Sequence, residues 1–243
     1  MIALFKKEVR AFLGSMIGYV VILTFLLMVS MMLWIFPGDF NLLDAGYAGL
    51  DNLFLLAPWV YMFLIPAITM RSFAEEKRNG TLELLFTKPI SDFQIIFAKF
   101  LAGMVLVLFS ITPTLVFYYT IYQLGNPAGN LDVGATMGSY IGLVLLATGF
   151  VSIGIFASSL TQSQIVSFIL AVFLSFVFYL GFDSLSGIAL LEKFDYLILQ
   201  LGINYHFLSL SRGVIDTRDL LYFIGLSALF MLATKTVLES RKW

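Results

Sequence analysis

The sequence predicts an all-α integral membrane protein with six transmembrane helices. Only 12% of its 243 residues are charged and 60% are hydrophobic, whereas soluble domains carry about 25% charged residues. Apolar runs close to the roughly 20 residues that a bilayer-crossing helix needs recur six times. We therefore interpret residues 1–243 as a single transmembrane domain.

Residues 1–15 are expected to form an amphipathic helix in the membrane interface. Apolar residues recur there at helical spacing, and basic residues occupy the other flank: Ile2, Phe5, Val9, Phe12 and Met16, against Lys6, Lys7 and Arg10. The apolar run that follows has about 21 residues, which exceeds the roughly 7–15 of a signal-peptide core. The alternative is a plain basic flank that only fixes the topology.

The six predicted spans cover residues 16–36, 53–70, 95–124, 137–160, 165–182 and 220–238. Pro58 and Pro66 lie in the second span, and Pro113 lies near the middle of the third. Residues 133–182 contain no charge, and the polar stretch 161–164 divides them into a helical hairpin. Beyond this hairpin, the outer segment 183–219 is predicted to contain two short helices, over 191–201 and 205–213.

Basic residues near the span ends predict the orientation. Three precede the first span, five flank the loop between spans two and three, and three follow the last span: Lys6, Lys7, Arg10, Arg71, Lys77, Arg78, Lys88, Lys99, Lys235, Arg241 and Lys242. We therefore expect both termini and the 71–94 loop to be cytoplasmic. The loops on the other side are acidic.

Composition excludes several kinds of chemistry. The chain has no cysteine and one histidine, so thiolate and multi-histidine metal sites are excluded. No G-x-x-x-x-G-K-[ST] pattern is present to bind phosphates. The predicted spans contain no carboxylate, which argues against a proton- or sodium-driven transporter. We expect a non-catalytic chain without a cofactor or metal of its own, in which His206 is an interfacial hydrogen-bonding residue.

The fourth span is rich in small residues, which permit close helix approach. They are Gly138, Gly142, Gly149, Gly154, Ala157 and Ser158. Two interpretations remain open at this stage: an interface with another subunit, or ordinary packing within the chain.

The 71–94 loop concentrates charge in an otherwise apolar sequence. Asn79-Gly80 predicts a turn, Thr81 is expected to cap the helix that follows, and Ser91 to cap the third span. The expected result is a short helix with an apolar tip, Leu84 and Leu85, and a polar rim: Glu75, Glu76, Arg78 and Glu83. Such a surface is suited to contact another protein. The alternative is a solvated loop that only fixes topology.

Residues 71–91 resemble the coupling-helix region of ABC-2 type permeases, the membrane subunits of ATP-binding-cassette exporters. Residues 158–165, 206–223 and 239–243 are similar to further segments of that family. The chain length and the sequences of these motifs are most similar to those of the gliding-motility permease of Bacteroidetes. The permease linked to copper-site maturation of nitrous oxide reductase is related to it.

The resemblance implies one transmembrane half of an exporter in the bacterial cytoplasmic (inner) membrane. A separate ATPase subunit, which binds ATP and Mg²⁺, would dock beneath the interfacial helix and the 71–91 segment. The coupling residues would be Glu75, Glu76, Arg78, Gly80, Thr81, Glu83, Leu84 and Leu85.

A second permease subunit, identical or paralogous, would complete the route through the bilayer, and no nucleic-acid partner is expected. Two other functions stay open from the residues alone. One is a mechanotransmitting or assembly component that the ATPase drives without moving cargo. The other is a stand-alone secondary transporter.

Overall fold

A computed structural model describes residues 1–186 and 195–240, and every regular element among them is helical. Six helical segments are long and apolar enough to cross a membrane: Gly18–Ile35, Asp51–Arg78, Asp92–Leu124, Val133–Leu160, Gln164–Ser186 and Thr217–Glu239. Each contains most or all of one predicted span. The prediction of an all-α, multi-pass membrane protein is therefore confirmed.

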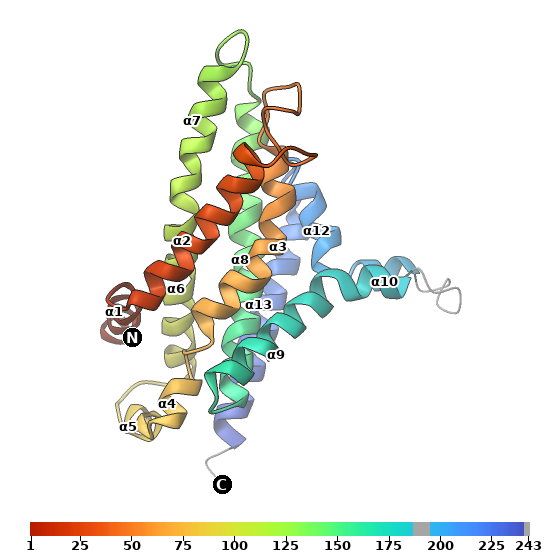
Figure 1. The fold of residues 1–243 in the computed structure, drawn as a ribbon. Helices are drawn as coiled ribbons and strands as arrows, with labels where there is room; N and C mark the ends of the chain where they lie inside the picture. The colour runs from red at the N-terminus through yellow and green to blue at the C-terminus, as the bar shows by residue number, and fades with distance from the viewer. Residues whose placement is uncertain (187–194, 241–243) are drawn as a thin grey trace.

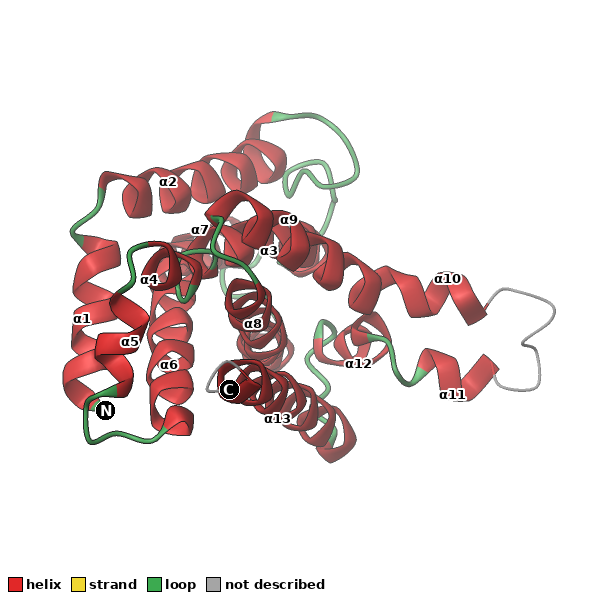
Figure 2. Ribbon diagram, turned by 90° about the horizontal axis from the view of Figure 1, so that it is seen from below, coloured by secondary structure: helices red, strands yellow, loops and turns green. Residues whose placement is uncertain are grey.

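Helix α8 (Val133–Leu160) occupies the middle of the bundle. It packs against α3 (Asp51–Thr69), α6 (Asp92–Ile111), α9 (Gln164–Phe176) and α13 (Thr217–Glu239), as Figures 1 and 2 show. Helix α2 (Met16–Ser30) lies at the periphery, beside α3.

The small residues of α8 make their close contacts within the chain. A Cβ on Gly138 would overlap the backbone of Gly213, and a Cβ on Gly154 would overlap the side chain of Thr69. At Gly142 a Cβ would lie 2.7 Å from the Cβ of Leu210. Of the two interpretations of this span, the structure therefore supports intrachain packing.

One proline interrupts a span, and two others lie within a continuous helix. The third span is interrupted by a 3₁₀ turn at Thr112–Thr114 before α7 (Leu115–Leu124), because Pro113 lacks the N–H that a continuous helix needs. Pro58 and Pro66 remain inside α3. Two further spans contain π-helical turns, η1 (Met31–Ile35) and η3 (Val177–Gly181).

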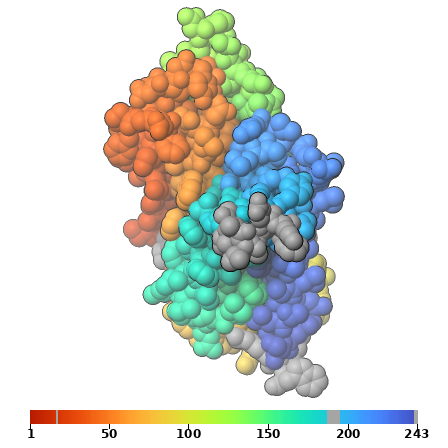
Figure 3. Space-filling view, turned by 90° about the vertical axis from the view of Figure 1, so that its right-hand side faces the viewer, coloured from red at the N-terminus to blue at the C-terminus, as the bar shows by residue number. Residues whose placement is uncertain are grey.

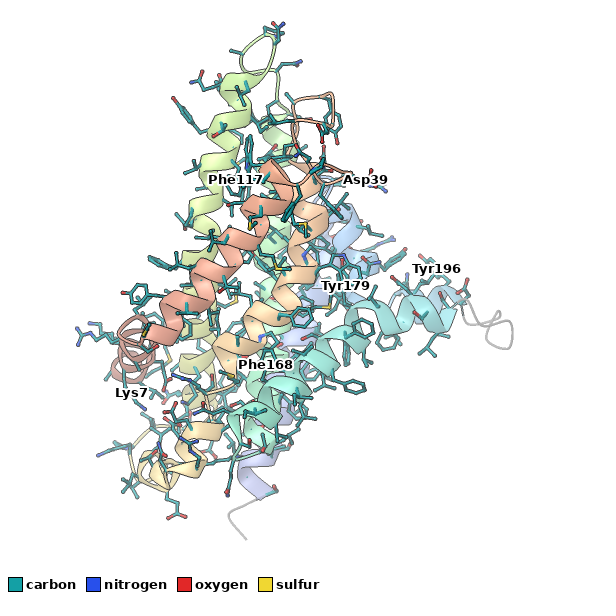
Figure 4. All side chains as sticks on the ribbon, in the orientation of Figure 1. Lys7, Asp39, Phe117, Phe168, Tyr179 and Tyr196 are labelled. Carbon is teal, nitrogen blue, oxygen red and sulfur yellow. The ribbon has the colours of Figure 1, made fainter. Side chains whose placement is uncertain are left out.

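The bundle has two chemically different ends. The lower end in Figure 1 holds α1 (Ile2–Leu13), α4 (Ala74–Arg78), α5 (Thr81–Phe86) and the C-terminal end of α13. We call it the basic end, and Lys7 is labelled there in Figure 4. The opposite end holds the loops after η1, α7 and α12, with Asp39 on the first. Arg241 and Lys242 lie outside the described residues, and the membrane side of each end stays a prediction.

The fifth span continues further than predicted, through η3 into α10 (Phe182–Ser186). The segment that follows contains α11 (Asp195–Leu199) and α12 (Ile203–Leu210). The predicted helix over 191–201 begins outside the described residues, and its described part forms α11. Helices α10 and α11 project sideways from the bundle (Figures 1 and 2), toward the viewer in Figure 3.

Within the described residues, the buried Asp, Glu, Lys and His side chains lie near the ends of the spans rather than at mid-bundle. They are Glu76, Lys77 and Lys99 at the basic end, and His206 and Asp219 toward the opposite end. Glu76 and Asp219 lie outside the predicted spans 53–70 and 220–238, but the observed apolar segments Asp51–Arg78 and Thr217–Glu239 are longer and contain them near their ends. The interior between them is apolar, with large buried side chains such as Phe54, Tyr61 and Phe150.

Candidate functional site

The 71–94 loop folds as two short helices rather than the single helix expected. Helix α4 ends at Arg78, and α5 begins at Thr81 after a turn at Asn79–Gly80. Gly80 has φ +67°, a left-handed conformation that residues with a Cβ adopt at a cost. Helix α4 has acidic residues in its first turn and basic residues in its last, which suits the helix dipole.

Ser158, near the basic end of α8, holds the start of α4 in place. Its hydroxyl accepts hydrogen bonds from the backbone N–H groups of Phe73 (2.9 Å) and Ala74 (3.0 Å) and donates one to the carbonyl of Met70 (3.0 Å). Ser158 is fully buried. One side chain thus satisfies three backbone groups at the turn between α3 and α4, which would otherwise be buried without partners.

A second link joins α4 to the end of α8. The ammonium of Lys77 donates a hydrogen bond to the carbonyl of Ser159, and Lys77 is only 8% exposed. The cation therefore sits at the C-terminal end of α8, where helix carbonyls lack intrahelical partners.

Four charged side chains link α1, α4 and α6. Lys7 Nζ lies 2.9 Å from Glu76 Oε1 and 3.5 Å from Glu8 Oε1, and Lys99 Nζ lies 3.0 Å from Glu76 Oε2 and 2.9 Å from Glu8 Oε1. Lys99 also donates to the Ser72 carbonyl at 2.5 Å. Two cations and two carboxylates alternate, so each buried charge faces opposite charges.

Burial and these neighbours act in opposite directions on Lys7. Burial alone would lower the pKa of Lys7, but the hydrogen bond and charge of Glu76, with Glu8 adding to them, raise it above its usual value. Lys7 therefore stays protonated throughout the neutral range. A cavity of about 300 Å³ opens beside the cluster, between α1, α4 and α6, with Arg71 and Glu75 also on its wall.

The exposed tip of the site is one leucine rather than two. Leu84 is 64% exposed, whereas Leu82 is buried and Leu85 packs partly against the core. The predicted apolar bump of Leu84 with Leu85 is corrected to Leu84 alone, because the helical turn of α5 directs Leu85 toward the bundle.

The predicted polar rim also changes. Arg78 and Glu83 are exposed and Glu75 is partly exposed, but Glu76 is buried and paired with Lys7 and Lys99. The Thr81 hydroxyl donates to the Glu76 carbonyl at 3.4 Å and does not cap α5, whose preceding residue is Gly80. The cap at Ser91 forms as predicted, in a reciprocal capping box with Gln94.

Of the expected interfacial-helix residues, Lys6, Lys7 and Arg10 all lie exposed on α1. Only Lys7 among them has an ion pair with α4. Glu8 belongs to the same cluster, although the sequence analysis did not select it. The sequence did offer a sign that Glu8 has a specific partner, because it is an acidic residue between basic residues on an amphipathic helix.

The fold defines a polytopic helical membrane protein with a small charged helical unit at its basic end, anchored to three helices and exposed at one apolar tip. The sequence pattern of ABC-2 family transporter proteins matches residues 2–240. The chain therefore belongs to this family and is a membrane component of such a transporter. The comparison with curated proteins returned no match.

Proposed function

We propose that this chain is the permease subunit that couples ATP hydrolysis by a separate ATPase subunit to export. The supporting observation is the construction of the α4–α5 unit. Its base is bonded to α8 through Ser158 and Lys77 and to α1 and α6 through Glu76, while Leu84 stands exposed. A displacement of α5 is passed through the Asn79–Gly80 turn to α4, and from α4 to three helices.

In this proposal the ATPase subunit binds ATP and Mg²⁺ and performs the chemistry. The permease chain is non-catalytic. Leu84 enters a groove on the ATPase, and Glu75, Arg78, Thr81 and Glu83 form the polar surround. Gly80 sets the angle between α4 and α5.

The orientation follows from the same proposal. The basic end is cytoplasmic, with both termini on that side of a bacterial inner membrane. By the family resemblance, a second permease subunit, identical or paralogous, completes the assembly. The exposed apolar side chains of α2 and α9 meet lipid or that subunit: Leu23 and Leu27, with Ile165, Ile169 and Phe173. The resemblance of the motif sequences favours a role in gliding motility. Deletion of the gene should then abolish gliding.

Changing Leu84 to Asp tests the coupling contact. An anchor residue in a protein interface typically contributes about 2 kcal/mol or more, so we expect roughly 30-fold weaker association with the ATPase. The tagged chain is purified from its native membranes, and the ATPase is detected by photolabelling with azido-ATP. The chain itself should still insert and fold, since Leu84 lies outside the apolar bundle.

Two variants serve as controls. Leu84→Met keeps an apolar tip and should retain the ATPase. Val214→Asp makes the same kind of change at a residue 59% exposed at the opposite end of the bundle, and should also retain it. Normal co-purification of the ATPase with Leu84→Asp would show that α5 is not the coupling contact.

A further inference from the structure

At the opposite end from α4–α5, the only histidine of the chain is buried in a hydrogen-bonded network. His206 of α12 places Nδ1 at 2.7 Å from Asp219 Oδ1 of α13 and Nε2 at 2.9 Å from the carbonyl oxygen of Gln200. Its ring stacks on Tyr222, with centroids 4.0 Å apart. Ser209 donates a hydrogen bond to the other carboxylate oxygen of Asp219.

The geometry fixes the number of protons in this network. A backbone carbonyl only accepts, so Nε2 must carry a hydrogen. The contact between Nδ1 and Asp219 at 2.7 Å requires a second hydrogen between those atoms. The pair therefore holds one proton more than a neutral imidazole beside an ionised carboxylate.

Removal of that proton breaks one of the two contacts. A neutral imidazole has only one N–H. If Nε2 keeps it, the lone pair of Nδ1 faces the carboxylate; if Nδ1 keeps it, the lone pair of Nε2 faces the carbonyl oxygen. Both partners are acceptors and the site is buried, so neither contact is replaced by simple rotation of the ring.

The contacts hold the residues after α11 against the last span. His206 bonds the carbonyl of Gln200, and the Tyr222 hydroxyl donates to the next carbonyl, Leu201, at 2.7 Å. We propose that this network is a proton-dependent latch, which holds residues 200–201 against α12 and α13 and releases them when the His206–Asp219 pair loses one proton.

Other ionisable groups lie on α12 and on the elements packed around it. They are Arg218 and Tyr222 on α13, Tyr205 on α12, Tyr196 on α11, Asp183 on α10, Tyr179 on η3 and Tyr140 on α8. Phenols and arginine do not change charge in the neutral range. Asp183 accepts a hydrogen bond from Asn204 at 2.5 Å. The direction is therefore fixed: the latch is closed in acid and opens as pH rises through the titration of the pair.

Asp219→Asn is the matched variant. An amide placed there can donate from Nδ2 to the unprotonated Nδ1 of a neutral His206 and accept from Ser209, while Nε2 still donates to Gln200. All contacts are satisfied without the extra proton, so this latch should stay closed across the neutral range.

The experiment uses the full chain in nanodiscs, purified with an affinity tag that contains no histidine. Because His206 is the only histidine, ¹⁵N-histidine labelling gives imidazole signals that need no assignment. We expect both nitrogens to be protonated at the acid end of a pH series in the native chain, and one proton to be lost toward its alkaline end. In Asp219→Asn the imidazole should be neutral throughout.

Hydrogen exchange of the amides around 199–206 reports the release. The native rate is divided by the Asp219→Asn rate at the same pH, which cancels the intrinsic pH dependence of exchange. This ratio should be near one in acid and rise about tenfold above the titration, as expected for loss of a hydrogen bond to a charged group. Amides of α4–α5 should show no such rise.

His206→Gln provides a second test if Asp219→Asn does not fold. Glutamine does not titrate, so its exchange pattern relative to α4–α5 should be the same at every pH. An imidazole that stays neutral throughout in the native chain overturns the proposal. So does an imidazole that titrates while the exchange ratio stays constant.

Discussion

Single side chains at the base of the α4–α5 unit determine how firmly it is held. Ser158 bonds three backbone groups across more than 80 positions of sequence, and Lys99, with its side chain 1% exposed, faces two carboxylates. Lys99 also lies over the Phe73 ring, 5.0 Å from its centroid. Removing one member of such a set leaves buried partners unsatisfied, which costs more than the bond itself.

Ser158→Ala should lower the free energy of unfolding by about 1–3 kcal/mol, because the amides of Phe73 and Ala74 lose their acceptor in a buried turn. Thermal unfolding in detergent measures it. Ser159→Ala is the control: the Ser159 hydroxyl bonds only the Phe156 carbonyl of its own helix, so the loss should stay under about 1 kcal/mol. Equal losses for the two variants would contradict the assigned role of Ser158.

Helix α8 organises the bundle because its small residues let neighbouring helices approach closely. Gly103 of α6 faces Val151, Gly149 faces Leu226 of α13, and Gly154 faces Thr69 of α3. The last contact lies one helical turn before Ser158, so the close packing of α3 on α8 and the fixed turn into α4 belong to one structural unit.

Gly154→Ala should destabilise the chain by about 1–3 kcal/mol, since the added methyl would overlap Thr69 and force α3 away from α8. Gly225→Ala in α13 is the matched control, because a Cβ there meets nothing within 4 Å. Alanine is favoured over glycine in helices by about 1 kcal/mol, so Gly225→Ala should be neutral or stabilising. The midpoints of unfolding of the two variants are compared. A lower midpoint for Gly154→Ala alone supports close packing of α3 on α8, and equal midpoints contradict it.

At the scale of the molecule, the buried Asp, Glu, Lys and His side chains among the described residues lie toward the two ends of an apolar bundle. The basic end contains the α1–α4–α6 charge cluster, and the opposite end contains the His206–Asp219 pair. Helices α2 and α9 leave large apolar surfaces at the periphery, which fits contact with lipid rather than water. The excess of Lys and Arg at the basic end predicts that this end lies in the cytoplasm.

Single cysteines test that orientation, since the native chain has none. Asn79 lies exposed in the turn between α4 and α5, and Asn130 lies exposed beyond α7. In intact cells an impermeant maleimide should label a cysteine at 130 and not one at 79. After the membrane is opened, both should react. Labelling of position 79 from outside would refute the orientation and the coupling site with it.

Hydropathy and charge bias along the chain were enough to determine the six spans, the two chemically different ends and the location of the 71–94 unit. These are local patterns, and the bilayer acts on each apolar run separately, so no contact between distant residues had to be known. The turn at Gly80 and the capping box at Ser91 are local too, and both were predictable.

Tertiary structure alone decided which residues of that unit face outward. Glu76 and Leu85 resemble their neighbours in sequence, yet Glu76 is buried because Lys7 and Lys99 lie opposite it, and Leu85 packs against the bundle. The glycines of α8 gained a single interpretation only when Thr69, Leu210 and Gly213 were placed against them. His206 likewise acquired its role through Asp219, because the proton count depends on which acceptors the fold sets beside each ring nitrogen.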